Sequence, residues 1–174
     1  MAGFLRRRSK HERSAFQLYG SAVAAARDPY LYATLGVPDT LDGRFDAIVL
    51  YVYLIVRRLD ADSGPALAQA VFDAMFMDMD INLREMGVGD LSVGKKMRKL
   101  GEAFYGRARA YEVALAAPEM EGLDALIERT IYDGVDASET ASLVSYVRRS
   151  VAALEAIPLN DVMAAKLNWA PIFR

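Results

Sequence analysis

Apolar residues recur at intervals of three and four positions along most of this 174-residue chain. That spacing gathers them on one face of an α-helix, whereas a half-buried strand would show strict alternation. Long stretches also lack the glycine, proline and asparagine clusters that bound short strands. The length suits one ordinary hydrophobic core and is too short for two well-filled ones. The sequence therefore predicts an all-α fold built as a single compact domain.

Helix-breaking and helix-capping residues divide this pattern into about six helices. The first is expected to end at the Asp28-Pro29 pair, and Thr40 is a suitable N-cap for the second. The expected helices run from His11 to Arg27, Thr40 to Leu59, Pro65 to Met86, Asp90 or Ser92 to Ala117, Gly122 to Tyr132, and Asp136 or Ser138 to the residue before Pro158.

The two ends of the chain are expected to behave differently. Residues 1–10 read as a basic N-terminal arm that is partly disordered, and residues 11–174 as a single helical domain. The tail from Leu159 onward is expected to form a short helical turn. It should then dock on the body through Trp169 and Phe173.

Charge is nearly balanced overall but uneven along the chain. The net charge is −2, which speaks against DNA as a partner. The N-terminus reads RRRSKHER and the middle reads GKKMRK, whereas the stretch from Glu119 to Glu139 carries seven acids against Arg129 alone. This asymmetry predicts a basic and an acidic surface, and hence an oriented encounter with a charged partner.

The longest apolar run, from Ala47 to Val56, indicates whether the chain can cross a membrane. It is about half the roughly 20 residues needed to span a bilayer, so it predicts a buried helix. The charged N-terminus is followed by no apolar segment of the kind found in secretory signals. We expect a soluble protein that is at most peripheral to a membrane.

Residues able to carry out chemistry are scarce. The chain has no cysteine, and its one histidine, His11, lies in the charged N-terminal segment. A thiolate site, a di-iron Glu-x-x-His bundle and a bis-histidine haem are therefore excluded. No phosphate-binding glycine loop or nucleophile elbow is present. The sequence predicts no catalytic residue, no cofactor and no metal site, and therefore no enzyme.

One acidic motif imitates a metal site. Asp78, Asp80 and Asn82 match the first three positions of an EF-hand loop, but Leu83 replaces the glycine of the sharp turn and Gly89 the final glutamate. On a helix, residues two apart point about 200° apart, so the two carboxylates cannot share an ion. The same geometry speaks against a helical enzyme acting on an isoprenoid through paired aspartates.

The third expected helix carries apolar residues on two sides. Its core stripe comprises Ala68, Val71, Phe72, Met75, Phe76, Met79 and Leu83. A second stripe comprises Ala70, Ala74, Met77 and Ile81. Another helix could cover this second stripe, as is usual for helices that are apolar all round. Alternatively, it lines a groove whose flexible methionine suits apolar clients of varied shape.

The fourth expected helix has an apolar half and a basic half. Its core stripe comprises Met97, Leu100, Phe104, Ala108, Tyr111 and Leu115. Basic residues dominate the opposite half, with Glu102 as the one acid among them and Tyr105 at the border. A solvated surface explains such a pattern in general, but this density of cations favours a docking face for an acidic partner. The candidate docking face comprises Lys95, Lys96, Arg98, Lys99, Tyr105, Arg107 and Arg109.

Three segments in this region resemble a known family. They are NLREMGVGDLSV (Asn82 to Val93), KKM (Lys95 to Met97) and AFYGR (Ala103 to Arg107). They are similar to the ubiquinol–cytochrome c chaperone family. The resemblance implies an all-helical chaperone domain that binds newly made cytochrome b and assists biogenesis of the ubiquinol–cytochrome c reductase complex. It implies no catalytic residue and no cofactor.

The same resemblance bears on partners. Mitochondrial relatives work with a small partner subunit and near the ribosomal exit tunnel. This N-terminus has only a short basic segment where they carry a presequence, which fits a bacterial protein. The alternative function is a peripheral membrane- or RNA-binding module acting through the basic face. An anionic membrane surface or a ribosome would then be the partner, although one aromatic residue, Tyr105, is too few for a dedicated single-strand binder.

Overall fold

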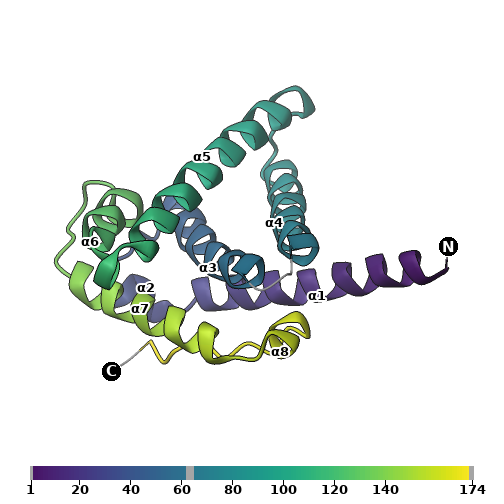
Figure 1. The fold of residues 1–174 in the computed structure, drawn as a ribbon. Helices are drawn as coiled ribbons and strands as arrows, with labels where there is room; N and C mark the ends of the chain where they lie inside the picture. Colours follow the sequence, from purple (N-terminus) through teal and green to yellow (C-terminus); the bar gives the residue numbers. More distant parts are fainter. Residues whose placement is uncertain (1, 62–64, 173–174) are drawn as a thin grey trace.

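The computed structural model describes residues 2–61 and 65–172, and within them every regular element is helical (Figure 1). The all-α prediction is confirmed. The elements are α1 (Ala2–Ala26), α2 (Pro29–Ala33), α3 (Leu41–Ala61), α4 (Pro65–Glu85), α5 (Asp90–Ala116), the 3₁₀ turn η1 (Pro118–Met120), α6 (Leu123–Ile127), the π-helical turn η2 (Glu128–Tyr132), α7 (Thr140–Ala156) and α8 (Leu159–Met163).

The core is organised around α3, because this helix contains the longest apolar run of the chain. Val49, Val52 and Ile55 are completely buried, and α1, α4, α5 and α7 pack against α3. The buried residues of these helices form one connected core. The expectation that the run from Ala47 to Val56 is a largely buried helix is confirmed.

Short polar contacts fix where the helices begin. Thr40 Oγ1 accepts a hydrogen bond of 3.1 Å from the Gly43 amide, so the predicted N-cap is confirmed. Asp28 Oδ1 accepts a bond of 2.9 Å from the Tyr30 amide and thereby caps α2. The sequence analysis missed α2 because Asp28-Pro29 both ends one helix and starts the next, with proline in the first turn where it is tolerated.

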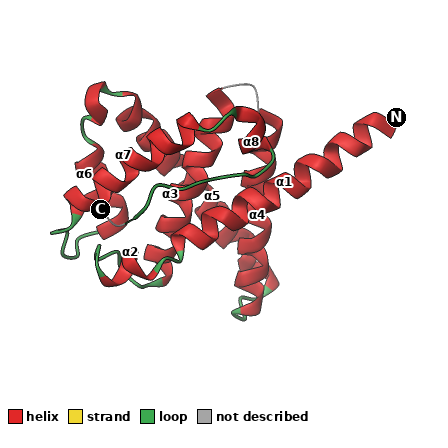
Figure 2. Ribbon diagram, turned by 90° about the horizontal axis from the view of Figure 1, so that it is seen from below, coloured by secondary structure: helices red, strands yellow, loops and turns green. Residues whose placement is uncertain are grey.

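The first helix begins earlier than expected. The predicted boundary at His11 is wrong, because α1 starts at Ala2 and runs without interruption to Ala26. No proline interrupts this stretch, and its arginine, lysine and leucine residues are good helix formers. Figure 2 shows the N-terminal part of α1 extending beyond the bundle. The partial disorder expected for residues 1–10 stays a prediction.

The C-terminal tail packs on the body, as predicted. Trp169 Nε1 donates a hydrogen bond of 3.0 Å to Ser21 Oγ of α1. The Trp169 ring also meets Tyr51 of α3 edge to face, with 5.0 Å between ring centroids. Phe173, the other expected contact, lies outside the described residues.

Candidate functional site

The hairpin formed by α4 and α5 stands out from the bundle (Figure 1). Its turn is a Schellman motif: the Val88 amide donates to the Leu83 carbonyl at 3.0 Å and the Gly87 amide to the Arg84 carbonyl at 2.9 Å. Gly87 adopts the left-handed φ of 80° that this motif requires. From this turn the two helices diverge, so the hairpin leaves an open angle between them above α3.

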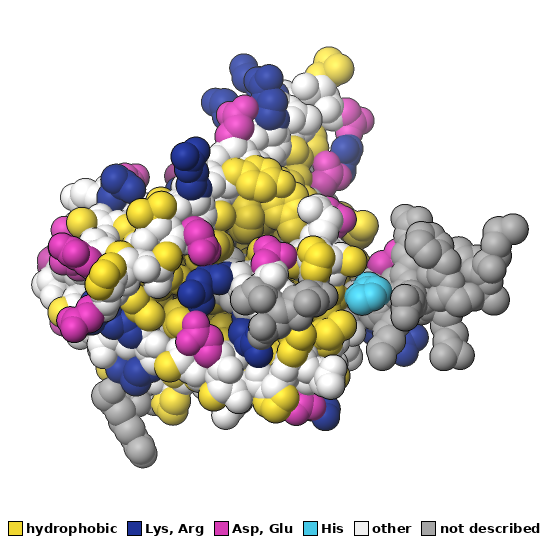
Figure 3. All heavy atoms as spheres, in the orientation of Figure 1, with side chains coloured by type: hydrophobic (Ala, Val, Ile, Leu, Met, Phe, Trp, Pro, Cys, Tyr) yellow, Lys and Arg dark blue, Asp and Glu magenta, His cyan; other side chains and the backbone are white. Residues whose placement is uncertain are grey.

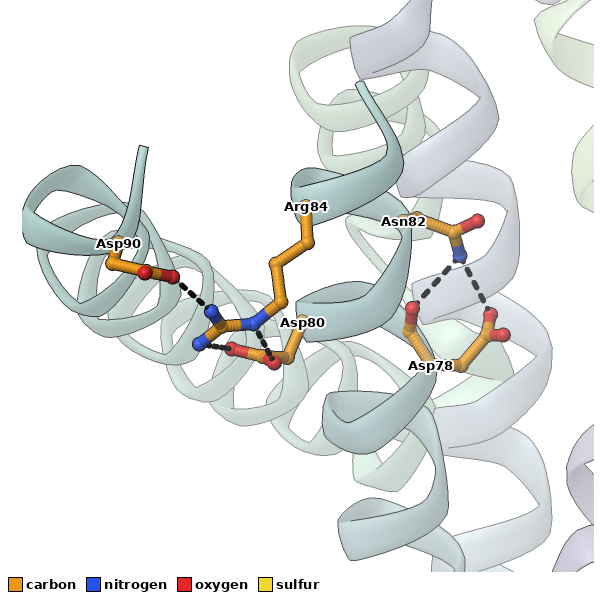
Figure 4. A network of polar contacts seen from close by, with 5 residues as sticks. All are labelled: Asp78, Asp80, Asn82, Arg84 and Asp90. Atoms are coloured by element: carbon orange, nitrogen blue, oxygen red, sulfur yellow. Dashed lines mark hydrogen bonds and ion pairs between the residues drawn. The ribbon is translucent and has the colours of Figure 1, made fainter. Parts of the chain in front are cut away.

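An arginine clamp ties the two helices together beside the turn (Figure 4). Arg84 Nε lies 2.7 Å from Asp80 Oδ2 on the same helix, and Arg84 Nη1 is hydrogen-bonded to Asp90 Oδ1 in the first turn of α5. Each pair is exposed to solvent, which screens the attraction, so neither adds much to stability. Together they fix the orientation of the first turn of α5 relative to α4.

The inner sides of the hairpin carry a cluster of aromatic rings. Phe72 contacts Phe76, Phe104 and Tyr105, with centroid separations of 4.4, 5.0 and 5.2 Å. Gly101 lies opposite, where a Cβ atom would be 3.6 Å from the Phe76 ring. We call the surface formed by Phe72, Phe76, Phe104 and Tyr105 the aromatic groove.

The aromatic groove is open to solvent along part of its length. Phe104 is buried and forms its floor, Phe72 and Phe76 are half-buried, and Tyr105 is 60% exposed. Figure 3 shows hydrophobic side chains lining a hollow between α4 and α5. Connected aromatic rings left at the surface offer a site for an apolar partner.

The predicted client groove on α4 is divided by the fold. Met77 and Ile81 are 55% and 49% exposed, whereas Ala74 is buried and Ala70 is half-buried. The inclusion of Ala74 in an exposed groove is therefore wrong. The reason is that α1 packs along this side of α4, and Tyr19 of α1 donates a 2.7 Å hydrogen bond to Asp78.

The structure also corrects the predicted core stripe of α4. Val71 and Met75 are fully buried as expected, but Phe72, Phe76 and Met79 reach only half burial. Both phenylalanines were predicted to lie in the core, so the aromatic groove was not predicted. Two features of the sequence could have indicated this groove. Phe72 and Phe76 lie four residues apart on one face of their helix, and the next helix carries two adjacent aromatic residues, Phe104 and Tyr105.

Most of the predicted basic docking face is exposed. Its solvent-facing cations are Lys95, Lys96, Arg98, Lys99 and Arg109. Tyr105 is exposed as well, although its ring leans on Phe72 and thus belongs to the aromatic groove. Placing Arg107 on this face was wrong. It lies beside the core, with Nη2 2.6 Å from Asp46 Oδ1 and its guanidinium 5.7 Å from the Phe45 ring centre.

The Asp46–Arg107 pair has unusual electrostatics because the Asp46 side chain is only 6% exposed. Burial raises the pKa of Asp46 to about 6, and the neighbouring Arg107 guanidinium opposes the rise. The carboxyl group therefore titrates near neutrality. The pair lies between α3 and α5, so it connects these two helices and is not part of the aromatic groove.

A polar cavity of about 620 Å³ lies among α3, α5 and α7. Three of its charged groups pair: Arg57 lies 3.1 Å from Glu155 and 3.9 Å from Glu112, and the Tyr53 hydroxyl donates to Glu112 at 2.5 Å. Arg58 donates to the carbonyls of Leu154 and Ile157 and so caps the end of α7. These interactions connect α3 to α5 and α7.

The acidic motif on α4 is distributed between two networks (Figure 4). Asp78 accepts hydrogen bonds from Tyr19 and Asn82, whereas Asp80 pairs with Arg84. Over the described part of the chain, no three histidine, aspartate or glutamate side chains gather as metal ligands would. Over the same residues, no helix combines the length and apolarity required to cross a bilayer.

Comparison with known proteins gives consistent matches. Residues 33–169 match the family model described as ubiquinol-cytochrome C chaperone. The chain is similar to ubiquinol-cytochrome c reductase complex assembly factor 1 of Homo sapiens, at 24% identity over 164 residues, covering 91% of this chain and 54% of the relative. The Xenopus laevis relative is 22% identical, with 91% of this chain and 82% of the relative covered.

The chain spans about half the length of the mouse and human relatives that it matches. A solved structure is similar over almost the full length. The crystal structure of the Cbp3 homolog from Brucella abortus has a TM-score of 0.85 and 34% sequence identity, covering 97% of this chain and 95% of that one.

Proposed function

Because the chain belongs to the ubiquinol–cytochrome c chaperone family, we propose that it is an assembly chaperone that holds newly made cytochrome b in the aromatic groove. The observation that carries this proposal is the partial exposure of Phe72, Phe76 and Tyr105 on the inner sides of the α4–α5 hairpin. An apolar segment of a membrane protein needs such a surface while it is outside the bilayer.

The chemistry around the groove suits a client of variable shape. Met79 is half-buried on α4, and Met97 is half-buried on α5. Methionine side chains are flexible and polarisable, so they adapt to differently shaped apolar partners. A helix of the client lying between α4 and α5 would follow the helix-in-groove mode of recognition.

We propose that this action is binding without catalysis. The groove is lined by aromatic side chains, and in the polar cavity Arg57 pairs with Glu155 while Tyr53 donates to Glu112. Neither surface presents a nucleophile beside a base. Assembly would then proceed by transfer of the held client to its next partner.

A second proposal is that the protein is cytoplasmic and associates peripherally with the inner membrane through its exposed cations. Lys95, Lys96 and Lys99 are free to meet an anionic surface. RNA of a ribosome is less favoured, because among the described residues Tyr105 is the one exposed aromatic side chain beside these cations, whereas single-strand binders stack several bases.

Site-specific photocrosslinking tests the client proposal. A photoreactive phenylalanine analogue replaces Tyr105 in one variant and Phe16 in another, since Phe16 is a similarly exposed aromatic on α1. We expect crosslinks to cytochrome b from position 105 and few from position 16. Equal crosslinking from both positions, or none from position 105, would refute the groove as the client site.

A further inference from the structure

The tip of the hairpin exposes large apolar side chains that the aromatic groove does not use. Leu91, in the first turn of α5, is fully exposed, and Met86, in the turn, is 55% exposed. We call these two residues the apolar tip. They lie at the end of the hairpin that points away from α3 (Figure 1). Packing against the core therefore does not explain why these two side chains are exposed.

Cationic side chains follow directly behind the apolar tip. Lys95 and Arg98 share the solvent-facing side of α5 with Leu91, and Lys99 flanks them. At a rise of about 1.5 Å per residue, they lie about 6 to 12 Å behind Leu91 along the helix. Figure 3 shows basic side chains gathered at this end of the hairpin. Glu85 and Glu102 are exposed nearby and offset part of this charge.

Acidic groups at the tip are held by the arginine clamp. Asp90 lies one residue before Leu91 and would repel an anionic surface if it were unpaired. It is bound to Arg84, which also holds Asp80 (Figure 4). The clamp therefore reduces the repulsion and fixes the direction in which Leu91 projects.

The opposite end of α5 carries the reverse charge. Exposed acids surround η1, α6 and η2, namely Glu119, Glu121, Asp124, Glu128, Asp133 and Asp136. Helix α5 has 27 residues and is about 40 Å long, so the two charge clusters are well separated. An anionic surface would attract the tip and repel the far end, which orients the molecule.

We propose that the apolar tip inserts into the interfacial layer of an anionic phospholipid membrane, with Lys95, Arg98 and Lys99 on the lipid headgroups. The order of side chains along the hairpin, apolar at the end and basic behind, matches the depth profile of that layer. This inference rests on the peripheral association proposed above and is independent of which client the groove holds.

Insertion would also place the groove close to the bilayer. Tyr105 lies 14 residues after Leu91, about 21 Å along α5. The groove would then lie just outside the headgroups, where an apolar segment could be received or released with little exposure to water.

Vesicle binding by the purified protein tests the insertion. Vesicles of phosphatidylcholine are compared with and without phosphatidylglycerol, and binding is expected with the anionic lipid alone. Met86→Ser with Leu91→Ser should weaken this binding about tenfold or more, because two apolar side chains are lost from the interface. The matched control is Val113→Ser with Val135→Ser, which removes two exposed apolar residues elsewhere and should leave binding unchanged.

The charge contribution is tested in the same assay. Lys95→Gln with Lys99→Gln should weaken binding about tenfold, and Arg129→Gln with Arg148→Gln, an equal charge change elsewhere, should not. If the lysine pair matters but the tip pair does not, the contact is purely electrostatic and insertion is refuted. Tighter binding to single-stranded RNA than to these vesicles would likewise overturn the proposal.

Insertion has a direct optical readout, because the chain contains no cysteine. An environment-sensitive fluorophore attached through Ser92→Cys, beside Leu91, should shift to shorter wavelength on anionic vesicles. The same label at Ala116→Cys, at the far end of α5, should not shift. An unshifted label at position 92 would overturn the proposal. Crosslinking of cytochrome b from position 105 in detergent reports the client proposal separately.

Discussion

The Arg107 guanidinium and the Asp46 carboxylate form an ion pair of 2.6 Å that joins α5 to α3 at the edge of the core. This contact is one of those that hold α5, and with it the hairpin, against the bundle. Removing one partner of such a pair leaves the other buried and uncompensated.

Replacing Arg107 by methionine should therefore lower the free energy of unfolding at neutral pH by about 1–3 kcal/mol, because Asp46 then takes up a proton and loses its partner. Urea denaturation measures this change. Arg109→Met is the matched control, since Arg109 is exposed on the same helix and its loss should cost no more than about 0.5 kcal/mol. Equal effects of the two variants would contradict a structural role for Arg107.

Asp46 should make stability depend on pH. Its pKa is about 6 in the folded protein and near 4 in the unfolded chain, so the folded state binds the proton more tightly. The stability that Asp46 contributes is fully present below about pH 4 and is lost as the pH rises through about 6. Asp46→Asn should abolish this loss. The difference in free energy of unfolding between the variant and the parent should therefore shift in favour of the variant as the pH rises from about 4 to 7. Denaturation curves at several pH values check the trend, and a constant difference would contradict it.

Two glycines should respond in opposite ways to alanine. A Cβ atom on Gly43 would lie 2.1 Å from the Pro38 carbonyl oxygen, so the backbone would have to move. Gly43→Ala should therefore lower the free energy of unfolding by about 1–3 kcal/mol. Gly94, inside α5, has nothing within 4 Å of the same position, so Gly94→Ala should gain about 0.5–1 kcal/mol from helix propensity. Thermal melting distinguishes the two outcomes.

The exposed part of the second stripe should matter little for folding. Met77→Ser with Ile81→Ser should lower stability by no more than about 1 kcal/mol, because both side chains are half exposed. Ala74→Leu, on the covered part, should cost about 1–3 kcal/mol by overfilling the contact between α4 and α1. Melting curves measure both, and a co-purification assay with cytochrome b shows whether Met77 and Ile81 extend the client site.

Helix positions were largely predictable from the sequence because they depend on local signals. Thr40 marks the start of α3, and the Gly87 region separates α4 from α5 where expected. The short helix α2 was not predicted, since its five residues are too few to show an apolar period and one dipeptide both ends α1 and begins α2. Helix α1 starts at Ala2 and not at His11, because arginine and lysine are compatible with a helix as well as with a solvated arm.

The candidate site was less predictable because it depends on which helix lies against which. The helical period places Phe72 and Ala74 correctly on different sides of α4. The period alone does not predict that α1 covers Ala74, or that α5 diverges from α4 and leaves Phe72 half-buried. Arg107 was misplaced for the same reason, since its partner Asp46 lies 61 residues away in the chain.

The docked tail gives this protein a built-in optical reporter. Its single tryptophan, Trp169, is hydrogen-bonded to Ser21 and packed against Tyr51, so its emission depends on contact between the end of the chain and the first and third helices. Release of the tail should redden that emission before the helical signal is lost. The hairpin contains no tryptophan, so a client bound there leaves the emission unchanged unless the distant tail also moves.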